Sequence, residues 1–310
     1  MNSKQKYSVV FFGTPDFSVP TLKLLTNNPE LEIILVVTQS DQPSGRGKKI
    51  IASPIKQLAH DLKLKISTDL KTATTEIIDL KPDLGIVVAY GEFLPEKLLN
   101  AFKFGCLNIH PSLLPLYRGP APIPACILNG DAETGVSIMK LDKEMDHGPI
   151  IVQEKFKLTG TETTATLLDK LSIVGGELLI KTLPLYLAGK ITPQEQNHNL
   201  ATFTELLKKE DGKLDLSQPA EKLARQIRSV LPWPSAETEI TIKNKVVKLK
   251  VLQAEAITLE NNKKTASEWL VENNQLIIVC GNNSGLNLKL LQPLGKNPQS
   301  ARDFINGYLK

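Results

Sequence analysis

The sequence has few cysteines, and none of them forms a metal-binding pattern. The three cysteines, at positions 106, 126 and 280, show no CxxC spacing, and their odd number argues against a disulfide framework. The four histidines are scattered and supply no set of metal ligands. We therefore expect free thiols in a reducing cytoplasm and no metal site.

Long apolar runs are also missing. No stretch approaches the roughly 18 apolar residues that a membrane-spanning helix needs. The first apolar run, residues 8–12, stops at once at Gly13-Thr14-Pro15-Asp16. That pattern is typical of a β-strand and not of a signal peptide. We expect no association with a membrane.

Two common catalytic signatures are absent as well. The first turn reads Gly-Thr-Pro-Asp-Phe at residues 13–17 and is not the GxGxxG fingerprint of dinucleotide-binding folds, which is consistent with a protein that needs no nicotinamide cofactor. No GxSxG elbow occurs either, and this argues against a serine nucleophile.

The first half of the chain alternates two kinds of segment. Nearly continuous apolar runs bounded by turns are typical of strands buried on both faces, and they occur at residues 8–12, 33–38, 84–90, 105–109, 135–141 and 150–156. Apolar residues recur at helical spacing at residues 16–25, 53–62, 72–80 and 163–189. Ser53 followed by Pro54 indicates a helix start. The alternation predicts an α/β fold with a doubly wound, Rossmann-like, mostly parallel sheet.

The last third has a different pattern. Residues 190–203 are polar and almost without periodicity, which is typical of a linker. One helix is predicted at residues 220–230, and strands follow at residues 236–242, 246–254, 275–280 and 286–293. Short strands at this spacing predict a small barrel or sandwich. We expect domains at residues 1–189 and 204–310, joined by a linker at 190–203.

The positive charge of the chain lies in this last third. Residues 1–203 carry 21 basic and 21 acidic side chains, whereas residues 204–310 carry 16 and 12, so the second part holds the whole net charge of +4. This is a weak indication of an anionic partner there, because solvated surfaces often carry such a surplus.

A candidate site follows the strand predicted at residues 105–109. Ligand sites of such sheets lie at the carboxyl ends of the strands. Asn108 and His110 are two residues apart, so an extended backbone places both on one face. An imidazole can move the proton of an attacking amine, and an amide N–H can stabilise an oxyanion. These residue types suit transfer of an acyl group, although an Asn-His pair at a strand end also occurs without any chemistry.

A histidine in this role needs a carboxylate to orient it. The segment at residues 141–149 offers three candidates, Asp142, Glu144 and Asp146, and spacing alone does not choose among them. His147, next to Asp146, is expected to face solvent.

Residues 105–151, read as a whole, resemble the core of the 10-formyltetrahydrofolate-dependent formyltransferases. The shared pattern is Asn-x-His followed by Ser-Leu-Leu-Pro and a later Asp. The resemblance implies that His110 shuttles the amine proton, that Asn108 stabilises the oxyanion and that Asp146 holds His110. It also implies folate binding by a stiff loop, since a proline-fixed backbone loses little entropy on binding. The loop residues are Ser112, Leu113, Leu114 and Pro115.

Residues 11–25 resemble the methionyl-tRNA and UDP-aminosugar formyltransferases, and residues 38–59 narrow the resemblance to the methionyl-tRNA formyltransferases. Residues 38–59 are similar to a basic loop that these enzymes use to approach the acceptor stem of tRNA. The resemblance implies that Arg46, Lys48 and Lys49 meet tRNA phosphates. A lone GRGKK sequence would favour a solvated loop, but the Ser-Pro-Ile-Lys that follows it in this setting favours contact with tRNA.

Residues 210–217, 231–238 and 291–307 resemble the carboxyl-terminal domain of the same enzymes, an OB-like β-barrel. Such barrels bind nucleic acid largely through its charged phosphate backbone. Lys296 is the candidate residue for such a phosphate contact in this domain. We expect a monomer that formylates the α-amino group of initiator methionyl-tRNA. The rivals are a UDP-aminosugar formyltransferase, a shorter glycinamide ribonucleotide formyltransferase and a catalytically idle tRNA- or folate-binding protein.

Overall fold

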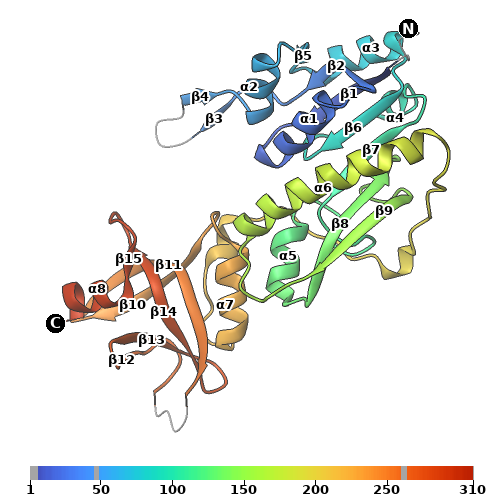
Figure 1. Ribbon diagram of the computed structural model, residues 1–310. Coiled ribbons are helices and arrows are strands. Elements are labelled where there is room, and N and C mark those ends of the chain that lie inside the picture. Colours follow the sequence, from blue (N-terminus) through green and yellow to red (C-terminus); the bar gives the residue numbers. More distant parts are fainter. Residues whose placement is uncertain (1–5, 45–48, 260–263, 310) are drawn as a thin grey trace. The chain divides into compact units, whose positions relative to one another are not determined.

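The structure is a computed structural model that describes residues 6–44, 49–259 and 264–309 (Figure 1). The chain divides into two compact units. Unit 1 consists of residues 1–119, 133–156 and 168–204, and unit 2 consists of residues 120–132, 157–167 and 205–310.

Unit 1 is built on a seven-stranded sheet with the order β5-β2-β1-β6-β7-β8-β9. Its strands are β1 (Tyr7–Gly13), β2 (Leu31–Val37), β5 (Ile66–Ser67), β6 (Leu84–Val88), β7 (Cys106–His110), β8 (Glu133–Lys140) and β9 (Ile150–Lys157). The five strands from β5 to β7 run parallel, and β8 is antiparallel to β7. The predicted α/β fold with a mostly parallel sheet is confirmed.

The strands of unit 1 form where the sequence is continuously apolar. All five residues of β6 are buried, and so are the last five of β1, as expected for strands covered on both faces. The chain goes from β1 to β2 on one side and later returns to β6 on the other. This change of direction creates a switch point, where such sheets place their ligands.

The helices of unit 1 begin at recognisable caps. The Ser53 side chain accepts a hydrogen bond from the Lys56 amide, and Pro54 is the first helical residue, as predicted. Asp69 caps the next helix by accepting from the amides of Lys71 and Thr72. The helices are α1 (Val19–Thr26), α2 (Pro54–Asp61), α3 (Leu70–Leu80), α4 (Glu96–Leu99) and the long α6 (Thr164–Leu187), part of which belongs to unit 2.

A short hairpin precedes α2. Strands β3 (Gln42–Ser44) and β4 (Lys49–Ile51) pair antiparallel with each other. The residues that connect them, 45–48, lie outside the described part of the chain. The predicted basic loop therefore starts from a hairpin that the sequence analysis did not anticipate.

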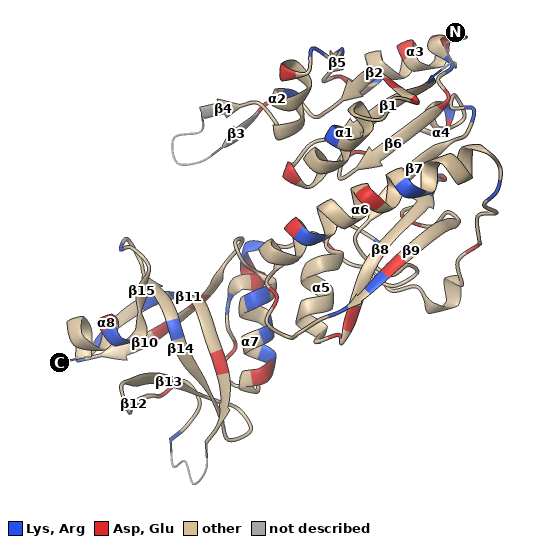
Figure 2. Ribbon diagram, viewed as in Figure 1, with Lys and Arg blue, Asp and Glu red and all other residues tan. Residues whose placement is uncertain are grey.

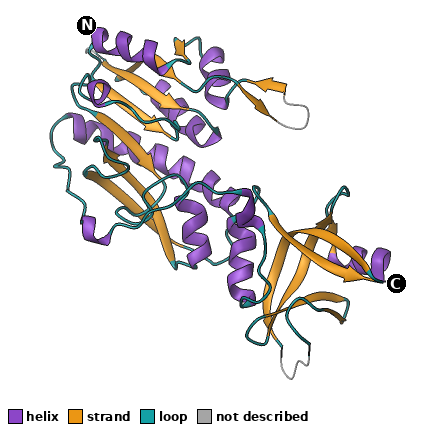
Figure 3. Cartoon of the chain, turned by 180° about the vertical axis from the view of Figure 1, so that it is seen from behind, coloured by secondary structure: helices purple, strands orange, loops and turns teal. Residues whose placement is uncertain are grey.

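Unit 2 is mostly β, as predicted, and its antiparallel strands curve into a half-barrel around one core (Figure 3). The sheet order is β10-β11-β14-β13-β12, with β15 paired to β14. Its strands are β10 (Ala236–Ile242), β11 (Lys245–Thr258), β12 (Trp269–Glu272), β13 (Gln275–Cys280), β14 (Ser284–Pro293) and β15 (Gln299–Ser300). Its helices are α5 (Pro122–Asn129), α7 (Ala220–Ser229) and α8 (Ala301–Phe304).

Helix α7 provides much of the core of unit 2. Leu223 and Ile227 are one turn apart, both are buried, and both belong to the cluster that includes residues of β11 and β14. Helix α5 packs against α7, and the Arg225 guanidinium donates to the Leu128 carbonyl. These contacts explain why residues 120–132 belong to unit 2 although the chain enters them from unit 1.

The last segment of unit 2 begins at residue 205, but the predicted linker and two earlier segments are divided between the units in other ways. Residues 190–204 belong to unit 1, because they pair with it at Ile150–Gln194 and at Arg118–Phe203. Residues 157–167 belong to unit 2, where the Thr164 hydroxyl donates to the Ser229 carbonyl. That the segment acts as a linker between two functional domains stays a prediction.

Within the residues that the structure describes, no helix is both long and apolar enough to cross a membrane.

Candidate active site

The strand β7 positions both residues of the Asn-His pair. Ile109, between them, is only 3% exposed and packs into the core. Asn108 and His110 consequently point to the opposite face, as the alternation of a strand requires. The structure brings both of them to one carboxylate, that of Asp146. His110 itself is buried.

Asp146 lies in the loop between β8 and β9, and three groups converge on its carboxylate. Oδ2 accepts a hydrogen bond from the Gly119 amide at 2.8 Å and lies 3.6 Å from His110 Nδ1. Oδ1 is 3.4 Å from Asn108 Nδ2. The backbone of Asp146 has φ 48°, a left-handed conformation that costs roughly 1–3 kcal/mol in a non-glycine residue. Other contacts must therefore hold this loop in place.

The other two candidate carboxylates have different partners. Asp142 Oδ2 is 2.6 Å from His147 Nδ1, and Asp142 Oδ1 accepts from the Glu144 amide. His147 is only partly exposed to solvent, because its ring also stacks on His198 with centroids 4.0 Å apart. Nothing in the sequence indicates this stacking, since His198 lies some fifty residues away in a polar segment. Of the three carboxylates, Asp146 is the one that the structure places at His110.

The hydrogen bonds of the His110 ring indicate which of its two nitrogens carries the proton. Nε2 lies 2.9 Å from the Tyr117 carbonyl. A carbonyl only accepts hydrogen bonds, so Nε2 carries the proton in this arrangement and Nδ1 faces Asp146. The 3.6 Å separation is longer than a hydrogen bond, and such contacts commonly tighten when substrate binds.

Residues 111–119 are held by hydrogen bonds within unit 1. Ser137 Oγ donates to the Ser112 carbonyl at 2.6 Å and accepts from the Leu114 amide at 3.0 Å. Gln153 Nε2 donates to the same hydroxyl and to the Leu114 carbonyl. The Leu114–Pro115 peptide bond is cis. The hydrogen bonds from Ser137 and Gln153 give the loop a fixed conformation before any ligand arrives.

The four residues expected to bind folate differ in accessibility. Ser112 and Leu114 are buried, and the Ser112 hydroxyl donates to the Leu116 carbonyl. Leu113 and Pro115 are half-buried. Ser112 and Leu114 thus shape the loop, while Leu113 and Pro115 keep surface that a ligand could reach. Direct contact of any of the four with folate stays a prediction.

Two residues that the sequence analysis missed support this loop. The Arg118 guanidinium is buried and donates to Gln196 Oε1 and to His198 Nδ1. Gln196 Nε2 in turn donates to the carbonyls of Asp146 and Gly148. Gln196 lies in the segment predicted as a linker, where nothing in the sequence distinguishes it from its polar neighbours.

The structure describes only part of the set of residues expected to bind tRNA. Arg46 and Lys48 lie outside the described residues, and Lys49 begins β4 with its side chain also outside them. Lys296 is exposed in the turn after β14. Lys and Arg also lie along α7 (Figure 2). Several lysines on the half-barrel form cross-strand ion pairs with glutamates: Lys248–Glu239, Lys250–Glu237 and Lys289–Glu255.

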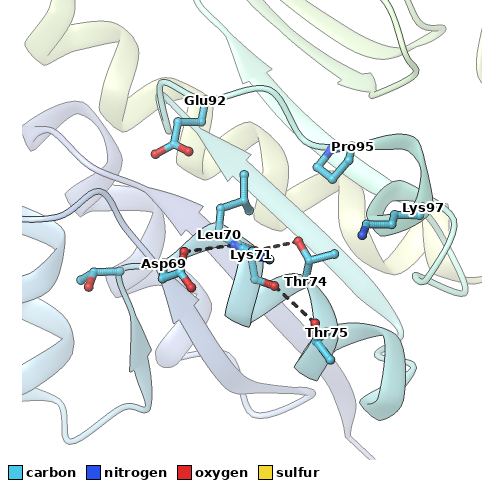
Figure 4. A pocket seen from close by; sticks show the side chains of 9 residues that line it. Asp69, Leu70, Lys71, Thr74, Thr75, Glu92, Pro95 and Lys97 are labelled. Atoms are coloured by element: carbon cyan, nitrogen blue, oxygen red, sulfur yellow. Dashed lines mark hydrogen bonds between the residues drawn. The ribbon is translucent and has the colours of Figure 1, made fainter.

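A separate hollow of about 630 Å³ lies where β5 and β6 lead into α3 and α4 (Figure 4). Its walls include Asp69, Lys71, Glu92 and Lys97 but none of Asn108, His110 and Asp146. Thr72 donates to the Asp69 carboxylate from its side chain and its amide, and these bonds lower the pKa of Asp69. The carboxylate of Asp69 is therefore already used as a helix cap.

Among the described residues, no cluster of three or more His, Cys, Asp or Glu side chains is arranged to hold a metal ion.

Comparison with known proteins identifies the family of the chain. Residues 6–183 match the formyl transferase family and residues 206–309 match the formyl transferase C-terminal domain. The methionyl-tRNA formyltransferase of Roseiflexus castenholzii is 41% identical over 303 residues, 96% of this chain and 95% of that protein. The methionyl-tRNA formyltransferase of Bacillus subtilis is 39% identical over 96% of this chain and 94% of its own length.

Solved structures share the fold. The sugar 3N-formyltransferase WlaRD, crystallised with dTDP and 5-N-formyl-THF, is 18% identical and superposes with a TM-score of 0.66 over 95% of this chain and 100% of its own. An N-formyltransferase from Helicobacter canadensis, in complex with folinic acid and dTDP-3-aminofucose, has the same score at 17% identity, over 93% of this chain and 100% of its own. The chain belongs to the formyl transferase family and, by its full-length similarity, to the methionyl-tRNA formyltransferases.

Proposed function

We propose that this chain transfers the formyl group of 10-formyltetrahydrofolate to the α-amino group of initiator methionyl-tRNA. The observation that carries the proposal is the convergence of Asn108, His110 and Gly119 on the Asp146 carboxylate, in a chain whose full-length relatives are methionyl-tRNA formyltransferases. The reaction makes the formylmethionyl-tRNA used to start translation.

The side chains at this site fit a formyl group. The donor supplies a formyl carbon attached to nitrogen. Asn108 Nδ2 is a donor that is only weakly engaged, at 3.4 Å from Asp146 Oδ1, so it is free to turn towards the formyl oxygen. There it would stabilise the negative charge that develops as the amine attacks.

His110 would move the proton. In the net reaction, the α-amino nitrogen gains the formyl carbon and loses a proton, and the donor nitrogen gains one. His110 Nε2 already carries a proton that the Tyr117 carbonyl accepts, and Nδ1 faces Asp146. Nδ1 is therefore the nitrogen that would take the amine proton and pass it to the donor nitrogen, and while Nδ1 carries that proton the Asp146 carboxylate would accept a hydrogen bond from it and stabilise the positive ring.

The donor would bind along the stiff loop that follows β7. Of the four residues assigned to this role, Leu113 and Pro115 would touch the folate, whereas the buried Ser112 and Leu114 would keep the loop in shape. We propose no metal ion and no nicotinamide in this reaction, because an amide, an imidazole and a carboxylate suffice for it.

The tRNA would be held by basic residues on both units. We assign phosphate contacts to Arg46 and Lys48 in the segment that connects β3 and β4, to Lys49 at the start of β4, and to Lys296 after β14. Each contact of this kind releases a counterion, so binding should weaken steeply with salt. We also propose that the chain acts as a monomer in the cytoplasm.

The decisive experiment offers three acceptors in parallel: charged initiator methionyl-tRNA, elongator methionyl-tRNA and an aminosugar nucleotide. The proposal predicts formylation of the initiator methionyl-tRNA well above the other two. Activity on the sugar alone would leave the catalytic assignment standing and overturn the acceptor. No activity on any acceptor, with folate binding retained, would favour an idle binding protein.

A further inference from the structure

The Asp146 carboxylate depends on a loop whose own conformation is unfavourable. Asp146 has a left-handed backbone, and it lies between β8 and β9 with its side chain only 13% exposed. The Asp146 carbonyl and the Gly148 carbonyl need donors to hold them there. Both receive a hydrogen bond from one side chain, that of Gln196, each at 2.8 Å.

The same side chain is tied to the second loop of the site. Gln196 Oε1 accepts from Arg118 Nε at 3.2 Å and from Arg118 Nη2 at 2.7 Å. Arg118 lies in the chain between Tyr117 and Gly119, and each of these two neighbours contacts one member of the His110–Asp146 pair. The Tyr117 carbonyl accepts from His110, and the Gly119 amide donates to Asp146. One amide therefore links both loops that meet at the His110–Asp146 pair.

The arrangement admits only one orientation of the amide. Gln196 is 5% exposed and Arg118 is 3% exposed, so neither has water to replace a lost partner. If the amide of Gln196 were turned over, its oxygen would face two carbonyls and its NH₂ group would face a guanidinium. Both contacts would be repulsive. The network thus fixes the relative position of the two loops as well as their conformations.

The segment that carries Gln196 is itself anchored to unit 1. The Arg118 amide donates to the Thr202 carbonyl and the Thr204 amide donates to the Arg118 carbonyl, both at 2.8 Å. At the other end, residues 150 and 194 exchange two backbone hydrogen bonds of 2.8 Å. Gln196 is held between these two attachments.

We propose that Gln196 is a positioning residue of the formyl transfer reaction, which acts by holding the Asp146 loop at the distance from His110 that catalysis needs. This inference rests on the proposed function. Gln196 touches neither substrate in this account, so its effect should appear in kcat and not in the KM of either substrate.

The test is Gln196→Glu, because glutamate keeps the shape and the contact to Arg118 but places an oxygen against the carbonyls of Asp146 and Gly148. A misplacement of about 1 Å at a catalytic group costs on the order of 100-fold in rate. We expect kcat to fall about 10- to 100-fold with both KM values within twofold. Gln196→Met, which removes the amide without adding charge, should reduce kcat to a similar degree. Gln194→Glu is the matched control, since Gln194 is exposed and lies two residues away, and it should keep full activity.

A double-mutant cycle separates positioning from general damage. Residues that act as a unit give strongly non-additive losses. In an Asp146→Ala background, Gln196→Glu should therefore cost less than about twofold more. Additive losses, or an unchanged kcat for both Gln196 variants with their thermal unfolding midpoints intact, would overturn the inference. If Asp146→Ala itself left formyl transfer unchanged, the proposed function of the trio would fail instead.

Discussion

The surroundings of Gly148 show how far the Asp146 loop would have to move to accept a larger residue. A Cβ atom built on Gly148 would lie 2.0 Å from the Lys140 carbonyl oxygen, and real Cβ contacts are essentially never shorter than 3.0 Å. Because the obstacle is backbone at the end of β8, no side chain can turn aside. In Gly148→Ala one of the two segments must move by about 1 Å.

That movement is transmitted to the reacting groups. Gly148 is two residues from Asp146, and its carbonyl is one of the two that Gln196 holds. A displacement of about 1 Å should lower kcat on the order of 100-fold, and the overpacking should lower the free energy of unfolding by about 1–3 kcal/mol. Single-turnover formyl transfer and denaturant unfolding measure the two effects.

Gly307→Ala is the control for this prediction. A Cβ atom on Gly307 would meet nothing within 4 Å, and the φ angle of Gly307 is not positive. The same substitution there should leave both kcat and stability nearly unchanged. A folded Gly148→Ala protein with kcat within twofold of the unsubstituted chain would refute the claim that the position of this loop controls the reaction.

Three further substitutions test separate parts of the site. Asp146→Asn should lower kcat by about 100-fold or more, whereas Asp142→Asn should change it less than about threefold because Asp142 pairs with His147; equal losses in steady-state kinetics would mean that the carboxylates are misassigned. Ser137→Ala should cost about 1–3 kcal/mol of unfolding free energy, since it leaves the buried Leu114 amide and Ser112 carbonyl without their shared partner; an unchanged denaturation midpoint would contradict this. Arg46→Ala should weaken tRNA binding and reduce the slope of log affinity against log salt by about 1; unchanged affinity at low salt would count against the proposed loop.

The buried parts of the fold were the most predictable. The runs at residues 8–12, 84–90 and 105–109 became β1, β6 and β7 because a strand covered on both faces must be continuously apolar. Ser53 and Pro54 marked the start of α2 because capping is a local property of a few neighbouring residues. Such local rules predicted the sheet and, through it, the common face of Asn108 and His110.

Features that depend on distant contacts were missed. Gln196 looked like part of a polar linker, yet its four hydrogen bonds reach residues 48 to 78 positions away along the chain. His147 was expected to face solvent, but its ring stacks on His198 and is only partly exposed. Residues 120–132 and 157–167 belong to unit 2 because of their packing and hydrogen bonds, which no spacing in the sequence reveals.

The choice of Asp146 also needed more than spacing. Asp142, Glu144 and Asp146 fall within five residues, and periodicity has no meaning in a turn. Resemblance to the formyltransferases selected Asp146, and the left-handed backbone at this residue explains how the loop turns its carboxylate towards His110. An aspartate can adopt a left-handed backbone conformation, but the sequence does not reveal which aspartate does so.

Asn108, His110 and Asp146 are the residues that we propose carry out formyl transfer to methionyl-tRNA. The most direct test is the single-turnover rate from 10-formyltetrahydrofolate to initiator methionyl-tRNA for the unsubstituted chain and for His110→Ala, together with the tRNA affinity of each. We predict a rate loss of about 100- to 10,000-fold with the tRNA affinity unchanged within twofold. A His110→Ala protein that transfers formyl at the full rate would contradict the account.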